Sequence, residues 1–381
     1  MLAQHNSFVD KVITSLISLF FLACADPVEP EFQFKEGLVY IEALASSKPG
    51  TSYVTITRSE FEFGIYKNIF LQKASVSFIN TETQSIVTLS EKGAYYLPPD
   101  NFKADIGDTW ELEVKLPDGT RYRSEPETIE SPVAIKDLKV AYEPELNFNV
   151  ALDTYIPGHR ILVGFDDPVE TENYYYWRYR TYEKLVQCRV CYSGYFRDGE
   201  CRLLPPANPP LGKPYYTYFC ESDCWQIRYV GNINIFSDKF SNGTGVSKLP
   251  IADIPLYTKR DILVELQQFS ISASAYHYLQ TLKDIIDDNS GLNAPLPAAL
   301  VGNLYNPDNK DEFVLGRFTA AATTTKSIFI TRTFVEDTPL EPVLKSQAEG
   351  FGDPVPSPNV LSVPCEESRY RTGVRPEGWV D

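Results

Sequence analysis

The seven cysteines are the residues of this 381-residue chain whose type and spacing could do the most chemistry. Cys24 stands alone near the N-terminus. The other six follow much later, at Cys188, Cys191, Cys201, Cys220, Cys224 and Cys365. An even number of cysteines in an exported chain indicates disulfide bonds, although the sequence does not choose among the pairings. Cys365 is distant from the rest, so we expect one bond to tie the C-terminal tail to the body, stabilising the fold by about 2–4 kcal/mol.

Two other chemistries compete for these cysteines. Cys188-x-x-Cys191 and Cys220-x-x-x-Cys224 approach the ligand spacing of a zinc ribbon. Cys188 and Cys191 also have the spacing of a redox-active pair. However, a thiolate cage is hard to keep reduced outside the cytoplasm, and no thioredoxin-like βαβ pattern surrounds the pair. We therefore predict disulfides, no metal site and no cofactor.

Sequence signatures of catalysis are missing. The chain has no Gly-x-Ser-x-Gly elbow, no His-Glu-x-x-His zinc helix and no Gly-x4-Gly-Lys phosphate loop. It has three histidines, of which His159, in Pro-Gly-His-Arg, is interpreted as a turn residue and His277 as a packed or exposed neighbour of aromatic residues. The segments 287–289 and 306–311 offer oxygen ligands for calcium, but neither has EF-hand spacing. The sequence therefore predicts a protein that is not an enzyme.

Aromatic residues gather between positions 174 and 229, which hold 11 of the 24 tyrosines. Tyrosine and tryptophan offer a large, rigid contact area with a polar group, which suits an interface or stacking on a ligand. The residues predicted to form a binding surface are Tyr174, Tyr176, Trp177, Tyr192, Tyr195, Tyr215, Tyr216 and Trp225. The alternative is that they fill a core and form cross-strand pairs. The sequence does not decide whether the ligand is a peptide, a glycan or a siderophore.

Charge and composition narrow the class of protein. The formal net charge is −16, from 51 acidic and 35 basic residues, which argues against nucleic-acid binding because that needs a cationic surface. Apolar residues make up 43% of the chain, enough for sizeable cores. Its 28 prolines, 24 tyrosines and single methionine are typical of an exported all-β protein rather than a helical cytoplasmic enzyme.

The N-terminal sequence gives a separate role to Cys24, the cysteine that makes the total an odd number. Lys11 precedes an apolar run over residues 12–23, which is too short to span a bilayer and has the layout of a secretory signal. Leu22-Ala23-Cys24 resembles the lipobox of bacterial lipoproteins. That resemblance implies cleavage before Cys24 and a diacylglycerol on its thiol. We therefore predict a signal peptide over 1–23, lipidation of Cys24 and a short acidic tether over 24–36.

Hydrophobic patterning predicts a mainly β protein. Short strands with polar turns over 37–131, such as the alternating Trp110, Leu112 and Val114, favour an immunoglobulin-like or fibronectin-like β-sandwich. A second β-sandwich domain is predicted over 132–336, with a Cys- and Tyr-rich irregular insertion at 186–225. Apolar residues at helical spacing, after a Ser272 N-cap, predict one helix over about 272–289. The Pro-rich stretch 337–381 is expected to be an extended tail tied by Cys365.

Several segments together resemble the domain-of-unknown-function family 4249 (DUF4249), lipoproteins of Bacteroidota. They are Cys220–Ile227, Asn234–Asp238, Leu266–Leu279, Val301–Leu304, Val314–Phe318, Cys365 and Gly373–Trp379. The resemblance spans most of the chain and implies a cell-envelope lipoprotein built of β-sandwich modules, often associated with outer-membrane TonB-dependent transporters. The family supplies no established catalytic residues.

Three functions remain open at this point. The first is an outer-membrane lipoprotein, on the periplasmic or the exposed side, that acts as accessory or substrate-capture partner of a TonB-dependent transporter. The second is a surface adhesion or structural module that needs no transporter. The third is a hydrolase whose site the sequence does not reveal.

Overall fold

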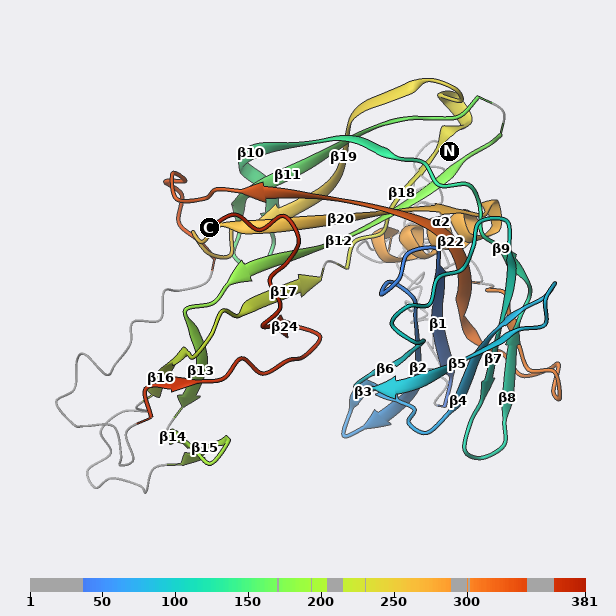
Figure 1. Cartoon of the computed structure of the whole chain (residues 1–381), viewed down its shortest axis with the longest axis horizontal. Coiled ribbons are helices and arrows are strands. Elements are labelled where there is room, and N and C mark those ends of the chain that lie inside the picture. Colours follow the sequence, from blue (N-terminus) through green and yellow to red (C-terminus); the bar gives the residue numbers. More distant parts are fainter. Residues whose placement is uncertain are drawn as a thin grey trace, which may run out of the picture. The chain divides into compact units, whose positions relative to one another are not determined.

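The computed structural model describes residues 37–169, 171–192, 194–203, 215–229, 231–288, 300, 302–340 and 360–381. The predicted signal peptide, the tether and Cys24 lie outside the described residues, as does most of the first half of the Pro-rich tail. Residues 38–381 form one compact unit. The prediction of a mainly β chain is confirmed (Figure 1).

The N-terminal part of the unit is a set of short strands around a hydrophobic core. The strands are β1 (Val39–Ser46), β2 (Tyr53–Glu62), β3 (Ile65–Phe70), β4 (Ser75–Asn80), β5 (Ile86–Lys92), β6 (Tyr95–Leu97), β7 (Thr109–Lys115), β8 (Arg121–Ser124) and β9 (Glu127–Thr128). The alternation predicted for Trp110, Leu112 and Val114 is present, since all three are buried and face Phe78 of β4 and its neighbours in the core. The immunoglobulin-like connectivity of this region stays a prediction.

A strand from late in the chain completes this first core. The first half of β22 (Leu315–Ile330) runs parallel to β1, and its second half pairs antiparallel with β20 (Ile262–Ile271), so one strand belongs to both parts of the unit (Figure 1). Phe318 of β22 is fully buried in the first core. Residues 37–131 are therefore joined by a strand from the later part of the chain, and the predicted division into two domains stays a prediction. The pairing is not visible in the sequence because it joins residues about 275 positions apart.

Two glycines allow this close junction. Gly316 has φ +101° and lies against the backbone of Ile41, where any Cβ would overlap the Ile41 carbonyl. A Cβ on Gly302 would overlap the Gly316 carbonyl in the same way. Between them, the Asn303 side chain donates to the Phe318 carbonyl at 2.9 Å and accepts from the Phe318 amide at 3.0 Å. These glycines and Asn303 therefore hold the start of β22 on the first core.

The second part of the unit packs one sheet on another. A three-stranded sheet of β10 (Ile135–Asn149), β11 (Thr154–Asp166) and β19 (Gly245–Pro255) covers one face of the sheet formed by β12 (Tyr174–Lys184), β20 and the second half of β22. Phe165 from β11 and Trp177 from β12 meet in the core between the sheets, with ring centroids 5.9 Å apart. The short strands β17 (Trp225–Tyr229) and β18 (Asn234–Ser237) extend β12 on its other edge.

The predicted helix is confirmed as α2 (Ala273–Asp288). The Ser272 hydroxyl accepts from the Ala275 amide at 3.2 Å, which is the expected N-cap contact. Ala275 and Tyr278 are buried, and Ala275 packs with Phe269 and Ile271 of β20. Within the described residues, no helix has the length and apolar composition needed to span a bilayer.

The cysteine-rich region is built of small sheets joined to the tail. Its strands are β13 (Gln187–Tyr192), β14 (Gly194–Arg197), β15 (Glu200–Leu203), β16 (Tyr215–Cys220), β23 (Ser362–Val363, paired with β16) and β24 (Arg371–Thr372, paired with β17). The short strand β21 (Leu304–Tyr305) pairs with β8 of the first core instead. The tail is therefore not free coil over 360–381. Its last turn places Trp379 in a buried cluster with Trp225 and Leu263.

Candidate functional site

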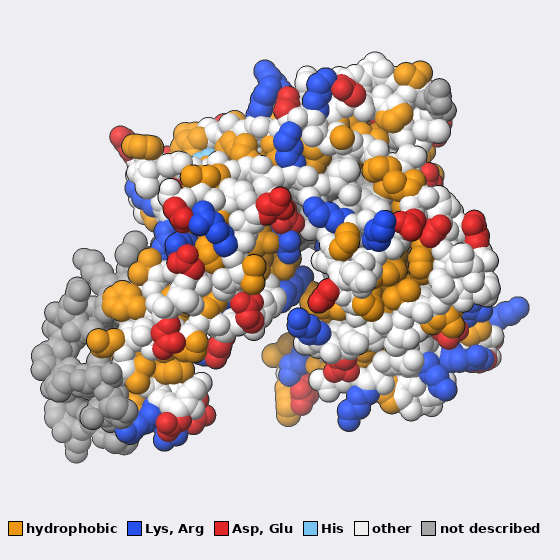
Figure 2. Space-filling view, in the orientation of Figure 1, with side chains coloured by type: hydrophobic (Ala, Val, Ile, Leu, Met, Phe, Trp, Pro, Cys, Tyr) orange, Lys and Arg blue, Asp and Glu red, His pale blue; other side chains and the backbone are white. Residues whose placement is uncertain are grey.

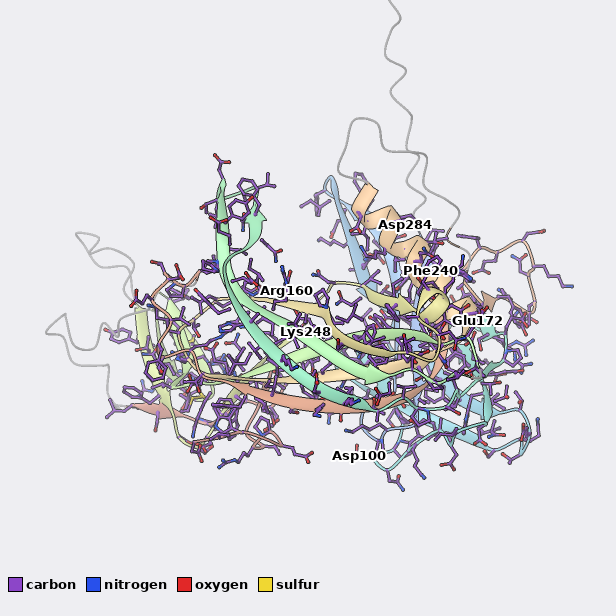
Figure 3. The ribbon with its side chains drawn as sticks, turned by 90° about the horizontal axis from the view of Figure 1, so that it is seen from above. Asp100, Arg160, Glu172, Phe240, Lys248 and Asp284 are labelled. Atoms are coloured by element: carbon purple, nitrogen blue, oxygen red, sulfur yellow. A yellow bond between two sulfur atoms is a disulfide. The ribbon has the colours of Figure 1, made fainter. Side chains whose placement is uncertain are left out.

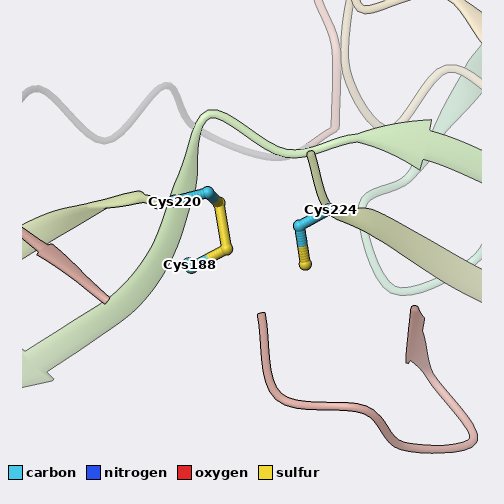
Figure 4. Close-up of side chains that lie close together, drawn as sticks. All are labelled: Cys188, Cys220 and Cys224. Atoms are coloured by element: carbon cyan, nitrogen blue, oxygen red, sulfur yellow. A yellow bond between two sulfur atoms is a disulfide. The ribbon is translucent and has the colours of Figure 1, made fainter. Parts of the chain in front are cut away.

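Six cysteines form three disulfides, as predicted, in the pairs Cys188–Cys220, Cys191–Cys201 and Cys224–Cys365. The expected bond between Cys365 and the body is the last of these. Figure 4 shows that Cys188, Cys220 and Cys224 lie close together, with their sulfur atoms within 4.8 Å of one another. Each of these sulfurs is already in an S–S bond and offers no thiolate to a metal ion. The cysteines therefore act as covalent links between strands.

The predicted aromatic surface divides between core and surface. Trp177 and Trp225 are each 1% exposed and lie in two different cores, so placing them on a binding surface was wrong. The physical reason is the period-two alternation of β12, which turns Trp177 toward the facing sheet, and the docking of Trp379 over Trp225. The alternative reading, sandwich core and cross-strand pairs, holds for both tryptophans.

The other predicted aromatics are scattered. Tyr174 and Tyr176 are half-buried on the opposite face of β12 from Trp177, beside α2. Tyr192 is 64% exposed, Tyr195 is half-buried, and Tyr216 packs against the disulfide cluster. The side chain of Tyr215 lies outside what the structure describes. The cysteine-rich region and β12 therefore do not present these aromatics as one surface.

The outer face of β12 carries a different constellation. Arg178 and Arg180 share this face with Tyr176, because residues two apart on a strand point the same way. Arg178 donates to the hydroxyl of Tyr53 on β2 at 2.5 Å. Its guanidinium lies 5.0 Å from the Tyr53 ring centroid and 5.5 Å from that of Phe269, in cation–π geometry.

Arginines and tyrosines from five segments, namely β12, β2, β6, β17 and the tail, close into a ring. From Arg178 the contacts pass through Tyr53 to Tyr95, whose ring centroids are 5.7 Å apart. Arg369 of the tail lies 4.6 Å from the Tyr95 centroid and 4.7 Å from that of Tyr229. Tyr229 is the cross-strand partner of Arg180, which returns the path to β12. We call this set the arginine–tyrosine ring; its members are Arg178, Tyr53, Tyr95, Arg369, Tyr229 and Arg180.

Two carboxylates, those of Glu265 and Glu42, form hydrogen bonds with residues of the ring. Glu265 holds Arg180 through two hydrogen bonds of 3.1 and 3.0 Å, a bidentate pair that fixes the guanidinium plane. Glu42 accepts a hydrogen bond from the Tyr53 hydroxyl. Burial raises the pKa of Tyr53 well above its usual value, with a further rise from Glu42 against a lowering by Arg178. The Tyr53 hydroxyl therefore stays protonated at neutral pH and can donate to Glu42 while it accepts from Arg178.

The sequence reasoning missed the ring but held a signal for half of it. Residues 174–180 read Tyr-Tyr-Tyr-Trp-Arg-Tyr-Arg, and strict alternation places both arginines on the face opposite to Trp177. Tyr53, Tyr95 and Arg369 carried no comparable signal. They reach the site through pairings of β2 and β6 and through the tail that Cys365 ties down.

The remaining polar candidates are occupied by internal contacts. His159 lies inside β11 and not in a turn, and burial together with Arg332 lowers its pKa to about 4, so it is neutral at pH 7. His277 is exposed on α2 beside Tyr276. In the loop 306–311, the Asn306 side-chain oxygen caps two backbone amides, and Asp308 pairs with Arg121. Nothing in these contacts favours catalysis or calcium binding.

A shallow pocket of about 440 Å³ lies near the end of the β10–β11 hairpin. The residues that line it are Pro144, Leu152, 154–157 and 337–340. The Asp337 carboxylate in this lining already accepts a hydrogen bond from the Tyr142 hydroxyl. The pocket thus lacks the converging free polar groups of a catalytic site.

Comparison with known proteins identifies one match. A family model described as a domain of unknown function, DUF4249, covers residues 25–327, more than half of the chain. A search of curated proteins gave no match.

Proposed function

Since the chain belongs to the DUF4249 family, we propose that it is a non-enzymatic lipoprotein of the cell envelope, tethered through Cys24. In this proposal it captures a ligand and serves as accessory partner of an outer-membrane TonB-dependent transporter. The observation that carries the capture role is the arginine–tyrosine ring, in which charged and aromatic groups converge from β12, β2, β6, β17 and the tail. Rigid tyrosines and arginines are the residues that dominate binding surfaces.

The three disulfides support an envelope location for the described body. Disulfides form and persist in oxidising compartments such as the periplasm or the cell surface. One of them, Cys224–Cys365, holds the tail segment that brings Arg369 to Tyr95. In this proposal an oxidising environment is therefore needed to assemble the ring as well as to stabilise the fold.

The anchor is testable by itself. Cys24→Ala removes the thiol that would carry the lipid, so the full-length protein is expected to move from the membrane fraction to the soluble envelope fraction. Fractionation of cells followed by immunoblotting measures this. Cys191→Ser is the matched control, because it removes a cysteine from the body and leaves the N-terminus intact. Unchanged membrane association of the Cys24→Ala protein would rule out lipid tethering at this residue.

The adhesion module and the hydrolase remain the alternatives. Gene neighbourhood separates the first two functions, since an adjacent gene for a TonB-dependent transporter is expected for a capture partner and not for an adhesion module. Internal ion pairs such as Arg160–Asp253 and Arg180–Glu265 occupy carboxylates that a hydrolase would use, which favours the non-enzymatic proposal.

A further inference from the structure

We propose that the arginine–tyrosine ring binds an organic ligand that carries several carboxylate groups, and that Arg178 is the residue that recognises one of them. The inference rests on the proposed function only in that the ring is taken as the capture surface. It adds the chemical class of the ligand. Three features of the ring support this ligand class: among the described residues Arg178 has no ion-pair partner, Arg369 has none either, and the ring carries net positive charge.

Arg178 is held in place without a direct ion pair to any described residue, and Glu42 acts on it from beyond the Tyr53 hydroxyl. Its one described hydrogen bond goes to a neutral phenol, that of Tyr53, and the rings of Tyr53 and Phe269 flank its guanidinium. Among the residues that the structure describes, no carboxylate oxygen lies within the 4.0 Å of an ion pair with Arg178. A guanidinium has five N–H donors in a fixed fork that matches a carboxylate. Arg178 is thus pre-organised to pair with a carboxylate that the described protein does not supply.

Arg180, its neighbour on the same face, shows the contrast. Glu265 satisfies Arg180 in bidentate geometry, and Gln267 also donates to that carboxylate at 3.1 Å. The two arginines lie two residues apart on one strand, yet the described chain provides an acid for only one of them. The free fork of Arg178 is therefore a specific feature of the ring and not a general property of this face.

Arg369 repeats the pattern at the far side of the ring. Its guanidinium contacts Tyr95, Tyr229 and Tyr370 at 4.6, 4.7 and 5.5 Å, all in cation–π geometry. Within the described parts of the chain, it too lies in no ion pair. Because two tyrosines in edge-to-face contact, Tyr53 and Tyr95, separate Arg369 from Arg178, a ligand that used both arginines would need carboxylates at separate positions along its length.

The charge of the ring is opposite to that of the protein. Arg178, Arg180 and Arg369 bring three positive charges, and Glu42 and Glu265 bring two negative ones, which leaves +1 on a chain of net charge −16. Lys48, which donates to Thr325 on the same sheet, adds a further positive charge nearby. Elsewhere on the face shown in Figure 2, acidic and basic side chains are interspersed. Local positive charge favours an anionic ligand.

The test is a calorimetric titration of the detergent-solubilised full-length lipoprotein with two carboxylate probes. The probes are tetragalacturonate and tetraglutamate, each compared with its neutral counterpart, the methyl-esterified tetragalacturonate and tetraglutamine. At least one acid is expected to bind about tenfold or more tightly than its neutral counterpart, since a charge-assisted bidentate contact contributes at least that factor. Which acid binds distinguishes a sugar source of the carboxylates from a peptide source.

Two substitutions assign the binding to the ring. Arg178→Met and Arg369→Met are each expected to weaken binding of that acid about tenfold. Arg160→Met is the matched control, because Arg160 is also a half-buried strand arginine but lies on the β10–β11–β19 sheet, paired with Asp253 (Figure 3). It is expected to leave affinity unchanged. Thermal unfolding of each variant confirms that it is folded, and Arg369, being exposed, can be changed with little effect on the core.

The inference is overturned if neither acid binds more tightly than its neutral counterpart, or if both ring variants bind the acid as well as the native protein. These outcomes leave the transporter partnership unaffected, since no barrel protein takes part in the titration. Conversely, absence of a barrel partner in membranes would leave a positive titration standing.

Discussion

Arg317→Met is expected to lower the free energy of unfolding by about 3–5 kcal/mol, the largest effect of any single substitution considered for this chain. Arg317 and Glu127 form an ion pair in which both side chains are 6% exposed. Removing one partner leaves the other charge buried and unpaired. Urea denaturation followed by tryptophan fluorescence measures the change as a shift of the midpoint at constant slope.

The effect is large because the pair sits where the two parts of the unit meet. Glu127 belongs to β9, Arg317 to the shared strand β22, and the Ser272 and Ser274 hydroxyls at the start of α2 donate to Glu127 at 2.8 and 3.2 Å. Arg317 also donates to Ser274 at 2.7 Å. One carboxylate thus connects the first core, β22 and the helix N-terminus.

The pH dependence of the Arg317→Met effect follows from Glu127. Burial raises the pKa of Glu127 in the folded protein, although Arg317 lowers it. Without Arg317 that pKa rises further. A carboxyl group whose folded pKa lies above its unfolded value contributes stability below the unfolded pKa and loses it as the pH rises through the folded pKa. The variant is therefore expected to be less destabilised at about pH 5 than at about pH 8.

A double variant controls this prediction. Glu127→Gln combined with Arg317→Met removes both charges and keeps one oxygen to accept from a serine hydroxyl, while its amide NH2 can donate to the other serine oxygen, so it is expected to recover most of the lost stability. If the Arg317→Met protein had the same urea midpoint as the native protein at pH 8, the ion pair would not be what holds the two parts of the unit together.

Replacing Cys224 and Cys365 with serine is expected to cost about 4 kcal/mol, because this disulfide closes the longest loop in the chain, with a sequence separation of 141. Apart from this bond, the tail from 360 onward is held by the short pairings of β23 and β24, by the Arg189–Glu366 ion pair, by Arg369 in the ring and by the packing of Trp379 on Trp225. Freed from the bond, the tail is expected to detach and expose both tryptophans. A red-shifted fluorescence spectrum and early proteolysis of the tail would report this.

The Cys191–Cys201 pair provides the matched control. Its sequence separation is 10, so the loop-closure entropy predicts a loss about 2 kcal/mol smaller for the Cys191→Ser, Cys201→Ser variant. Neither cysteine contacts the tail cluster of Trp225 and Trp379. Equal losses from the two double variants, with unchanged tryptophan emission in both, would contradict the assigned role of Cys365.

Local features of the fold could be predicted because their signals are local. The Ser272 cap with its apolar stripe predicted α2 to within one residue at each end. The even cysteine count predicted disulfides, and the isolation of Cys365 predicted which end of the chain would be tied. The causes are a capping contact, a helical periodicity and the preference of exported cysteines for disulfides. Each of them depends on residue types and spacings that are visible in the sequence.

Non-local features could not be predicted in the same way. The parallel pairing of β1 with β22 is fixed by close contacts at Gly302 and Gly316, and a glycine in a sequence does not show which backbone it will touch. The same limit explains the error at Trp177 and Trp225. A cluster of aromatic residues in a sequence is typical both of a buried core and of a binding surface. Which of the two a given residue joins depends on the face of the strand that carries it.

Affinity purification from gently solubilised membranes tests the central claim, partnership with a transporter, most directly. A tag inserted in the exposed turn at Asp100 leaves Cys24 and the ring residues unchanged in sequence (Figure 3). The account predicts that a TonB-dependent barrel protein co-purifies with the native chain and is depleted in the Cys24→Ala preparation. If no barrel protein accompanies the native lipoprotein, even after cross-linking in intact cells, the proposed partnership is wrong.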